Sequence, residues 1–163
     1  MLQQLSNGNW SWQISPEIRG SFPIAFIQAL SSWRQIRCLS REAGGLILGY
    51  IDIETGGLLA EKLTTPGRGD QRSRTGFFRG VNHQLDAAKW HHSTAGRGTM
   101  LGLWHTHPEP IPTPSGTDWT DLSNVLAQGQ HNGQGLIYII VGTTKISCWF
   151  GQRGGKIKKL GDI

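Results

Sequence analysis

Two histidines one residue apart stand out in the segment LGLWHTHPEPIPTPSGTDW, residues 101–119. On a β-strand, residues i and i+2 point to the same face with Cα atoms about 7 Å apart, so His105 and His107 can converge on one ion. Two imidazoles and one carboxylate form a recurrent zinc ligand set that leaves a fourth position for water. Asp118 is the expected third ligand, because a helix that begins at Ser115 turns this carboxylate back toward the end of the strand. The spacing therefore predicts a metal site.

The path between the histidines and the aspartate carries proline at every second position. The prolines are Pro108, Pro110, Pro112 and Pro114. Proline fixes φ and reduces the conformational freedom of a loop, so we expect the returning ligand to be positioned in advance. A solvent-facing polyproline II segment that binds an SH3-like partner is the alternative. It is the weaker interpretation, because it leaves the flanking histidines and aspartate unexplained.

Ser115 has two interpretations that can coexist. A serine at the N-cap of a helix with an acid three residues later is a variant of the capping box. The same hydroxyl can also act beside a metal. The remaining histidines are expected to be structural, and they are His83, His91, His92 and His131. Adjacent histidines on a helix, such as the 91–92 pair, point in different directions and make a poor ligand pair.

Helices and strands alternate around this motif. Hydrophobic spacing predicts a buried strand over 99–104 and a helix over 115–128. Further expected elements are helices over 21–40 and 81–96, a β-hairpin of 46–53 and 57–64, and strands over 135–142, 145–151 and 155–160. Residues 64–76 are rich in Gly and Arg and lack periodicity, so a mobile loop that either contacts substrate or is passive is expected there. The pattern predicts one α/β domain over residues 1–163, with a mixed sheet.

Composition places the chain among globular proteins and away from membrane proteins. It has 163 residues, of which 37% are hydrophobic and 17% charged, and no apolar run approaches the ~20 residues of a membrane helix. The N-terminus lacks the regions of a secretory signal, so a cytoplasmic protein is expected, and we expect a monomer. Cys38 and Cys148 lie far apart without C-x-x-C spacing, and buried reduced thiols are predicted.

The net charge of +5 and the pI near 9.6 raise the question of nucleic-acid binding. Much of the excess lies in residues 67–80 and 151–162, and neither segment is an RNP motif, a zinc finger or a basic helix. Solvated loops and a solvated last strand are therefore expected, and nucleic acid is an unlikely partner. An acidic protein partner is the next alternative.

The pattern H-x-H-x(7)-S-x-x-D resembles the signature of the JAMM/MPN+ (JAB) metalloprotease family. That family also has an upstream glutamate near the start of a strand, and Glu42 in REAGGLILGYI stands in this context. The lead-in LGLWHTHP and the surroundings of GFFRG match as well. The resemblance covers nearly the whole chain, and no essential motif position is missing. It implies a cytidine deaminase-like domain with a mostly antiparallel sheet and about three helices.

The resemblance also implies a zinc isopeptidase or peptidase. His105, His107 and Asp118 would hold Zn²⁺. Glu42 would deprotonate the zinc-bound water and then protonate the leaving amine, and Ser115 would hydrogen-bond the water or the tetrahedral oxyanion. Zinc chemistry suits these roles, since the metal lowers the pKa of its water to about 7.

The chain alone leaves other acids open as the general base, namely Asp52, Glu54 and Glu61. Glu42 is favoured because it is expected at the C-terminal end of the helix over 21–40, where the helix dipole disfavours a carboxylate. Residues that are locally out of place are often functional.

Single-domain prokaryotic members of this family cleave amide bonds after protein C-termini. They include peptidases that process ubiquitin-like sulfur carriers, deubiquitinase-like enzymes, and the deconjugating peptidase of CBASS antiphage systems. The last releases a cGAS-like nucleotidyltransferase from the protein to which its C-terminus is joined. The size and tryptophan content of this chain are most similar to this conjugation-associated group. The expected substrate is therefore a protein tail.

Four other classes fit less well. Inactive MPN scaffolds usually lose metal ligands, which this chain keeps. DNA-associated RadC-type domains typically carry Asn between the histidines and Ser-Gly after the first proline, where this chain has Thr106 and Glu109-Pro110. Fe(II) oxygenases generally use H-x-D/E with a distant histidine, which is the wrong order here. Amidohydrolase barrels need a far longer chain.

Overall fold

The computed structural model describes residues 1–128 and 131–163. Its main element is one sheet of nine strands in the order β1-β2-β3-β5-β4-β8-β9-β10-β11. These strands are β1 (Leu2–Gln4), β2 (Trp10–Ser15), β3 (Ile18–Phe22), β4 (Gly44–Ile51), β5 (Leu58–Leu63), β8 (Thr99–Thr106), β9 (Gly135–Val141), β10 (Ile146–Gln152) and β11 (Ile157–Asp162). A separate two-stranded sheet joins β6 (Gln71–Ser73) to β7 (Gly76–Phe78), and the helices are α1 (Ile24–Ser31), α2 (Asn82–Ser93) and α3 (Gly116–Gln128).

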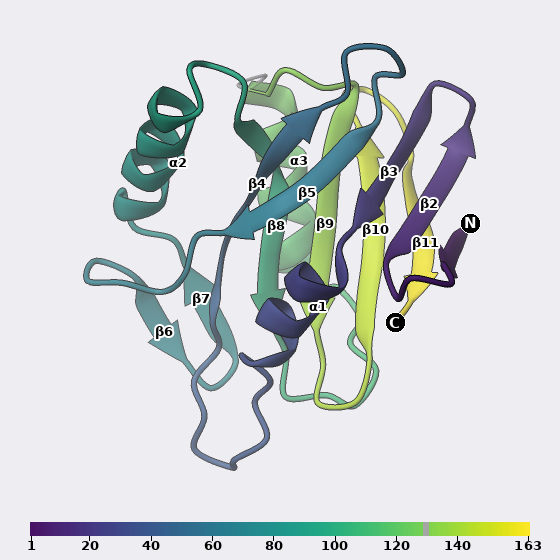
Figure 1. Cartoon of the computed structure of the whole chain (residues 1–163). Coiled ribbons are helices and arrows are strands. Elements are labelled where there is room, and N and C mark those ends of the chain that lie inside the picture. The colour runs from purple at the N-terminus through teal and green to yellow at the C-terminus, as the bar shows by residue number, and fades with distance from the viewer. Residues whose placement is uncertain (129–130) are drawn as a thin grey trace.

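The large sheet is mixed and mostly antiparallel. Only β3 with β5 and β8 with β9 pair in parallel among its neighbouring strands. Figure 1 shows α1 in front of the sheet, α3 behind it and α2 beside β4. This arrangement confirms the predicted α/β fold with a mixed sheet and three helices in the described part of the chain.

Strand β9 explains how both faces of the sheet are covered. All seven of its residues are buried, as expected for a strand between two layers of helix. Alternate side chains, including Ile137 and Ile139, pack with Phe26 and Leu30 of α1 in one hydrophobic cluster. The other set, including Tyr138, packs with α3 in a second cluster. Because successive side chains of a strand point to opposite faces, the one apolar run of β9 contributes to both hydrophobic clusters.

The predicted helix over 21–40 is too long, because α1 ends at Ser31. Tertiary contacts draw the following residues away from a helical path. Arg34 donates to the carbonyl oxygen of Gly142, and the buried amide of Gln35 binds the carbonyl oxygen of Ser40 at 3.0 Å. Strands β1, β2 and β3 were not predicted, although the sequence WSWQIS of β2 alternates apolar and polar residues, which is the signal of a half-buried strand.

The expectation of an irregular loop over 64–76 is wrong, because β6 lies within it and pairs with β7. Asp70 organises this segment from within. Its carboxylate accepts the backbone N–H groups of Gly67 and Gly80 at 2.8 and 2.7 Å and contacts His83 at 2.9 Å. Such local capping by one aspartate carries no hydrophobic periodicity, so the sequence pattern did not reveal it.

The remaining elements agree with expectation to within a few residues at their ends. They are the β4–β5 hairpin, α2, β8, α3 and the three C-terminal strands. Cys148 is buried as predicted, whereas Cys38 is exposed on the loop that replaces the end of the expected helix. Among the described residues, no helix is both long enough and apolar enough to cross a membrane.

Candidate metal centre

Both histidines lie at the C-terminal end of strand β8. His105 lies between Gly44 of β4 and Ile140 of β9 in the sheet register. His107 follows the strand and donates its backbone N–H to the carbonyl oxygen of Val141 at 3.0 Å. Both imidazoles are buried. Neighbours on both sides of the strand therefore fix where the two rings lie.

Asp118 lies in the first turn of α3. The backbone N–H of Asp118 donates to Ser115 Oγ at 3.2 Å, and the backbone N–H of Ser115 donates to Asp118 Oδ2 at 2.6 Å. This reciprocal pair has the geometry of a capping box, so the predicted N-cap is present. The cap orients the carboxylate, and α3 itself is held on the sheet by its buried residues Leu122 and Leu126.

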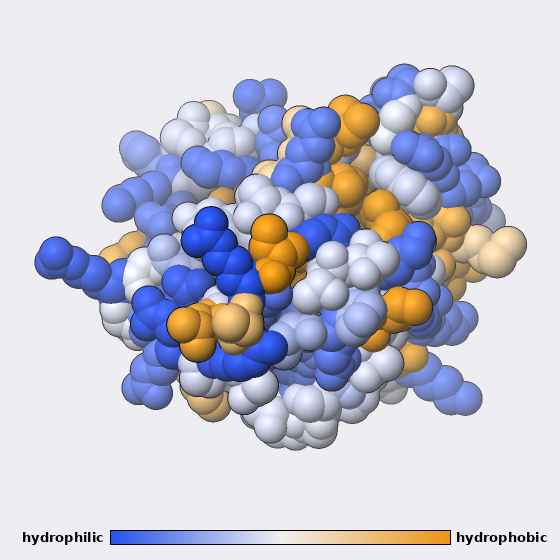
Figure 2. Space-filling view, turned by 90° about the horizontal axis from the view of Figure 1, so that it is seen from below, coloured by the Kyte–Doolittle hydropathy of each residue, from blue (hydrophilic) through white to orange (hydrophobic). Residues whose placement is uncertain are grey.

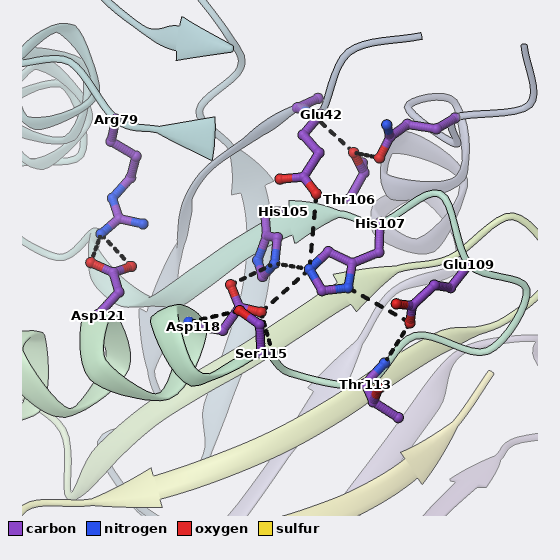
Figure 3. Close-up of polar contacts among 12 residues, drawn as sticks. Glu42, Arg79, His105, Thr106, His107, Glu109, Thr113, Ser115, Asp118 and Asp121 are labelled. Atoms are coloured by element: carbon purple, nitrogen blue, oxygen red, sulfur yellow. Dashed lines mark hydrogen bonds and ion pairs between the residues drawn. The ribbon is translucent and has the colours of Figure 1, made fainter. Parts of the chain in front are cut away.

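The ligand atoms of these three side chains face one another (Figure 3). The Nε2 atoms of His105 and His107 are 2.9 Å apart, and they lie 3.1 and 3.3 Å from the two carboxylate oxygens of Asp118. Zinc bonds of ~2.0–2.1 Å in a tetrahedron place neighbouring ligand atoms about 3.3 Å apart. The donor set and its spacing thus fit a zinc ion. His105, His107 and Asp118 thus form a group whose ligand atoms are close enough together to bind one metal ion.

Burial and mutual contacts shift the ionisation of the ligands. Burial lowers the pKa of His105, which favours the neutral ring that coordinates metals. Burial opposes charge on Asp118 too, but the hydrogen bonds from the two histidines outweigh it and hold its pKa below the usual range. At His107 burial also opposes charge, while Asp118 and the nearby carboxylates raise the net pKa. Asp118 is therefore an ionised oxygen donor beside two imidazole nitrogens, a donor set that suits a cation.

Glu42 faces this cluster from the other side. Its Oε1 lies 4.0 Å from Nε2 of His107, and its side chain is 6% exposed. Burial raises the pKa of Glu42 to about 7; His107 lowers it, while Asp118 and Glu109 raise it. A carboxyl with a pKa near neutrality can both accept and return a proton at physiological pH. The structure thus brings Glu42 together with the three predicted ligands.

The reason given for Glu42 from the sequence is nevertheless wrong. The residue lies at no helix end, since α1 stops at Ser31 and Glu42 lies two residues before the start of β4. The alternative acids lie elsewhere. Because β4 begins at the metal centre, the β4–β5 turn with Asp52 and Glu54 lies at the opposite end of the hairpin, and Glu61 is exposed on β5.

Strand β6 and the residues around it hold Glu42 in place, which the sequence did not indicate. The backbone N–H of Glu42 donates to the carbonyl oxygen of Ser73 at 2.7 Å, and Nε of Arg72 donates to the carbonyl oxygen of Glu42 at 2.6 Å. A Cβ at Gly44 would lie 2.5 Å from the ring of Phe77. Glycine at this position therefore allows β7 to pack close to Glu42.

Glu109 is a second residue that the sequence analysis did not assign. Its Oε2 lies 3.8 Å from Nδ1 of His107 and accepts the backbone N–H of Thr113 at 3.2 Å. A carboxylate behind a ligating histidine orients the ring and increases its basicity. The feature of the sequence that could have indicated Glu109 is its position two residues after His107, between two prolines.

The other histidines have structural contacts, as expected, where the structure gives them partners. His83 is buried between Thr64 at 2.6 Å and Asp70 at 2.9 Å. The ring of His91 contacts the carbonyl oxygen of Gly98 at 2.7 Å.

The basic residues over 67–80 are less solvated than expected. Arg79 pairs with Asp121 of α3 through two contacts of 2.9 Å. Arg72 binds the main chain of Glu42, and Arg74 donates to the carbonyl oxygen of Cys38. Guanidinium groups with five donors suit such multiple contacts. These three arginines therefore connect the segment to the rest of the molecule.

A comparison with protein families identifies the domain. A model described as prokaryotic homologs of the JAB domain matches residues 28–151, which include all five predicted site residues. The chain belongs to this family. The JAB family and the names of the relatives below indicate a hydrolase of the peptidase class.

Curated relatives of this JAB domain carry one name. A CD-NTase/cGAS isopeptidase of Escherichia coli (strain TW11681) is 35% identical over 138 residues, which cover 82% of each chain. The protein of the same name from Vibrio cholerae serotype O1 is 33% identical over 78% of this chain and 77% of its own. A third, from Pseudomonas aeruginosa, is 39% identical over 61% of this chain and 62% of its own.

A solved structure supports the fold alone. The solution structure of protein DSY2949 from Desulfitobacterium hafniense matches with a TM-score of 0.55 and 22% identity, over 82% of this chain and 83% of that one.

Proposed function

We propose that this JAB domain is a zinc-dependent isopeptidase that hydrolyses the amide bond after the C-terminus of a CD-NTase conjugated to another protein, as in CBASS antiphage defence. The observation that carries the proposal is the convergence of His105, His107 and Asp118, with Glu42 4.0 Å from one of them. Relatives named CD-NTase/cGAS isopeptidase support the choice of substrate.

The two histidines and Asp118 would hold the zinc ion. When bound, zinc lowers the pKa of water and stabilises negative charge on the oxygen of the attacked carbonyl. Glu42 would accept a proton from the attacking water at a carboxylate oxygen and pass it to the nitrogen of the leaving lysine.

Ser115 can serve the fold and the reaction with different atoms. Its Oγ accepts the N–H of Asp118 as helix cap, which leaves its own O–H proton free to donate. We propose that this proton binds the oxyanion of the tetrahedral intermediate. Donors of this kind contribute about 2–4 kcal/mol to transition-state stability.

A purified conjugate of a CD-NTase tests this proposal. The C-terminus of the nucleotidyltransferase is joined to a lysine of an acceptor protein, and release is followed on gels with and without a chelator. We expect release that the chelator stops and that Zn²⁺ restores. A ubiquitin-like fusion and a sulfur-carrier precursor serve as competing substrates, and cleavage of either in place of the conjugate would contradict the proposed substrate.

The variant Glu42→Gln separates catalysis from metal binding. We expect it to lower kcat by about 10²–10⁴-fold, the contribution of a general base, while zinc content measured by mass spectrometry stays at one ion per chain. Glu61→Gln removes an exposed carboxylate of β5 and is the matched control. Turnover of Glu42→Gln near the wild-type rate would contradict the mechanism. Stoichiometric iron without zinc in the purified protein would contradict it as well.

A further inference from the structure

The loop between α1 and β4, residues 32–43, crosses the lower end of the molecule in Figure 1, beside the metal centre. The buried amide of Gln35 fixes it from inside. Its Nε2 donates to the carbonyl oxygens of Ser40 and Arg74 at 3.0 and 2.9 Å, and its Oε1 accepts the hydroxyl of Thr106 at 2.8 Å. The loop therefore has a defined shape, and it is joined both to β8 and to the turn after β6.

The outward side chains of this loop are aliphatic and cationic. Ile36 and Leu39 are 76% and 88% exposed, and Arg37 and Arg41 are exposed beside them. Figure 2, the view from below, shows hydrophobic residues next to strongly hydrophilic ones at this end of the molecule. Two exposed aliphatic side chains add nothing to the core. Arginine and apolar side chains on a preorganised support are instead typical of surfaces that bind proteins.

Arginines of the β6–β7 segment adjoin the loop. Arg74 donates to the carbonyl oxygen of Cys38, and Nη2 of Arg72 lies 3.4 Å from the carbonyl oxygen of Arg41. Four guanidinium groups from two segments thus share one surface. We define the basic patch by six residues, which are Ile36, Arg37, Leu39, Arg41, Arg72 and Arg74.

The basic patch carries more positive charge than the carboxylates around it balance: Asp70 acts on Arg72 from a distance and favours its charge, and in the described part of the chain the three other arginines have no such partner in direct contact. Among the described residues, no carboxylate lies within the 4.0 Å ion-pair distance of its four guanidinium groups. Arg79 is different, because Asp121 pairs with it. The carbonyl oxygens that Arg72 and Arg74 contact accept hydrogen bonds but carry no net charge. Like charges gathered without counterions repel one another, so an anionic partner would relieve this cost.

We propose that the basic patch binds an acidic and partly apolar segment of the substrate protein next to the amide bond that is cut. This inference rests on the proposed function, and it names the chemistry of the substrate surface. The short path from the patch to the metal centre favours this proposal. Arg72 of the patch binds the main chain of Glu42, and the side chain of Glu42 faces His107. Ile36 and Leu39 favour a protein over nucleic acid, since phosphates are poor partners for aliphatic side chains.

Binding to the full-length protein tests the partner without requiring catalysis. The probes are a fluorescein-labelled twelve-residue peptide of glutamate, leucine and glycine, the same peptide with glutamine for glutamate, and a twelve-nucleotide single-stranded DNA. The double variant R37Q/R41Q removes two charges of the patch and no contact of Glu42. R97Q/R153Q removes two exposed charges at the opposite end of the sheet and is the matched control.

We expect fluorescence anisotropy to show binding of the acidic peptide that R37Q/R41Q weakens by about fivefold and the control by less than about twofold, as two exposed charge contacts allow. The glutamine peptide should bind more weakly than the acidic one. Equal weakening in both variants would mean that net charge alone attracts the peptide, and tighter binding of the DNA that depends on the patch would assign the surface to nucleic acid. Either result overturns the proposal.

Kinetics on the conjugate provide a second readout. R37Q/R41Q should raise KM by about fivefold at low salt and leave kcat unchanged, and the difference should shrink at high salt because exposed charges are screened. An unchanged KM overturns the proposal. If the wild-type protein with zinc cleaves no conjugate, the proposed function fails, and the binding experiment still decides whether the patch recognises acidic protein segments.

Discussion

Ser115 lies at the junction between the proline loop and α3, where one side chain has to satisfy two demands. As helix cap it accepts a backbone N–H group, and the capped residue is Asp118, the third predicted metal ligand. The hydroxyl proton takes no part in that cap. Stability and catalysis therefore depend on different atoms of one residue, and substitutions can separate them.

We predict that Ser115→Ala lowers the free energy of unfolding by about 1 kcal/mol through loss of the cap. The same change should lower kcat by about 10²-fold, the effect of losing an oxyanion donor. Ser115→Gly is the informative partner, because glycine at an N-cap costs only a few tenths of a kcal/mol. It should retain stability in urea titrations and still lose activity. If Ser115→Gly is as active as the wild type, the hydroxyl acts only as a cap.

At the scale of elements, a chain of buried polar groups ties the β6–β7 segment to the sheet. Thr64 Oγ1 accepts the backbone N–H of Leu46 at 2.7 Å and contacts Nδ1 of His83 at 2.6 Å, while Nε2 of His83 contacts Asp70 at 2.9 Å. The Asp70 carboxylate can only accept, so Nε2 of His83 donates to it, and in the neutral ring Nδ1 then accepts the Thr64 hydroxyl. The imidazole of His83 on α2 is thus linked to Thr64 after β5, through Thr64 to β4, and to Asp70 before β6.

We therefore predict that His83→Leu lowers the free energy of unfolding by about 2–4 kcal/mol, because it leaves Thr64 and Asp70 buried without their partner. It should also lower kcat, since β6 holds the main chain of Glu42. His92→Ala changes an exposed histidine of the same helix and should stay within about 0.5 kcal/mol of the wild type. Urea denaturation measures both, and equal stability of the two variants would show that the chain of contacts is unimportant.

For the molecule as a whole, the buried carboxyl of Glu42 makes stability depend on pH. Burial raises its pKa from 4.5 to about 7 in the folded metal-free protein. Between these two values the unfolded chain has lost the proton and the folded chain still holds it. Unfolding then releases a proton, so the contribution of Glu42 to stability falls as pH rises through this window and is lowest above pH 7.

Glutamine at this position cannot ionise, so we predict that metal-free Glu42→Gln gains stability over the wild type as pH rises. The gain should be near zero at pH 4 and reach on the order of 1–3 kcal/mol at pH 8. Thermal and urea unfolding at both pH values in the presence of a chelator measure it. A difference between the two proteins that does not change with pH would refute the buried, proton-retaining carboxyl.

Local patterns in the sequence indicated the three proposed metal ligands and most of the regular elements. The i, i+2 histidines, the serine–aspartate cap and the alternation along β9 depend on neighbours within one segment, and the structure has each of them. These features survive folding because backbone geometry alone sets the direction of such side chains.

Tertiary structure decided what stands around the ligands. Whether Glu42 or another acid faces His107 depends on the pairing of β4 with β8, and the end of α1 depends on the distant contacts of Arg34 and Gln35. The same holds for the arginines of the β6–β7 segment and for the patch that they form. Such contacts join residues far apart in the chain, and no local propensity encodes them, because their energy exists only once the sheet has brought the segments together.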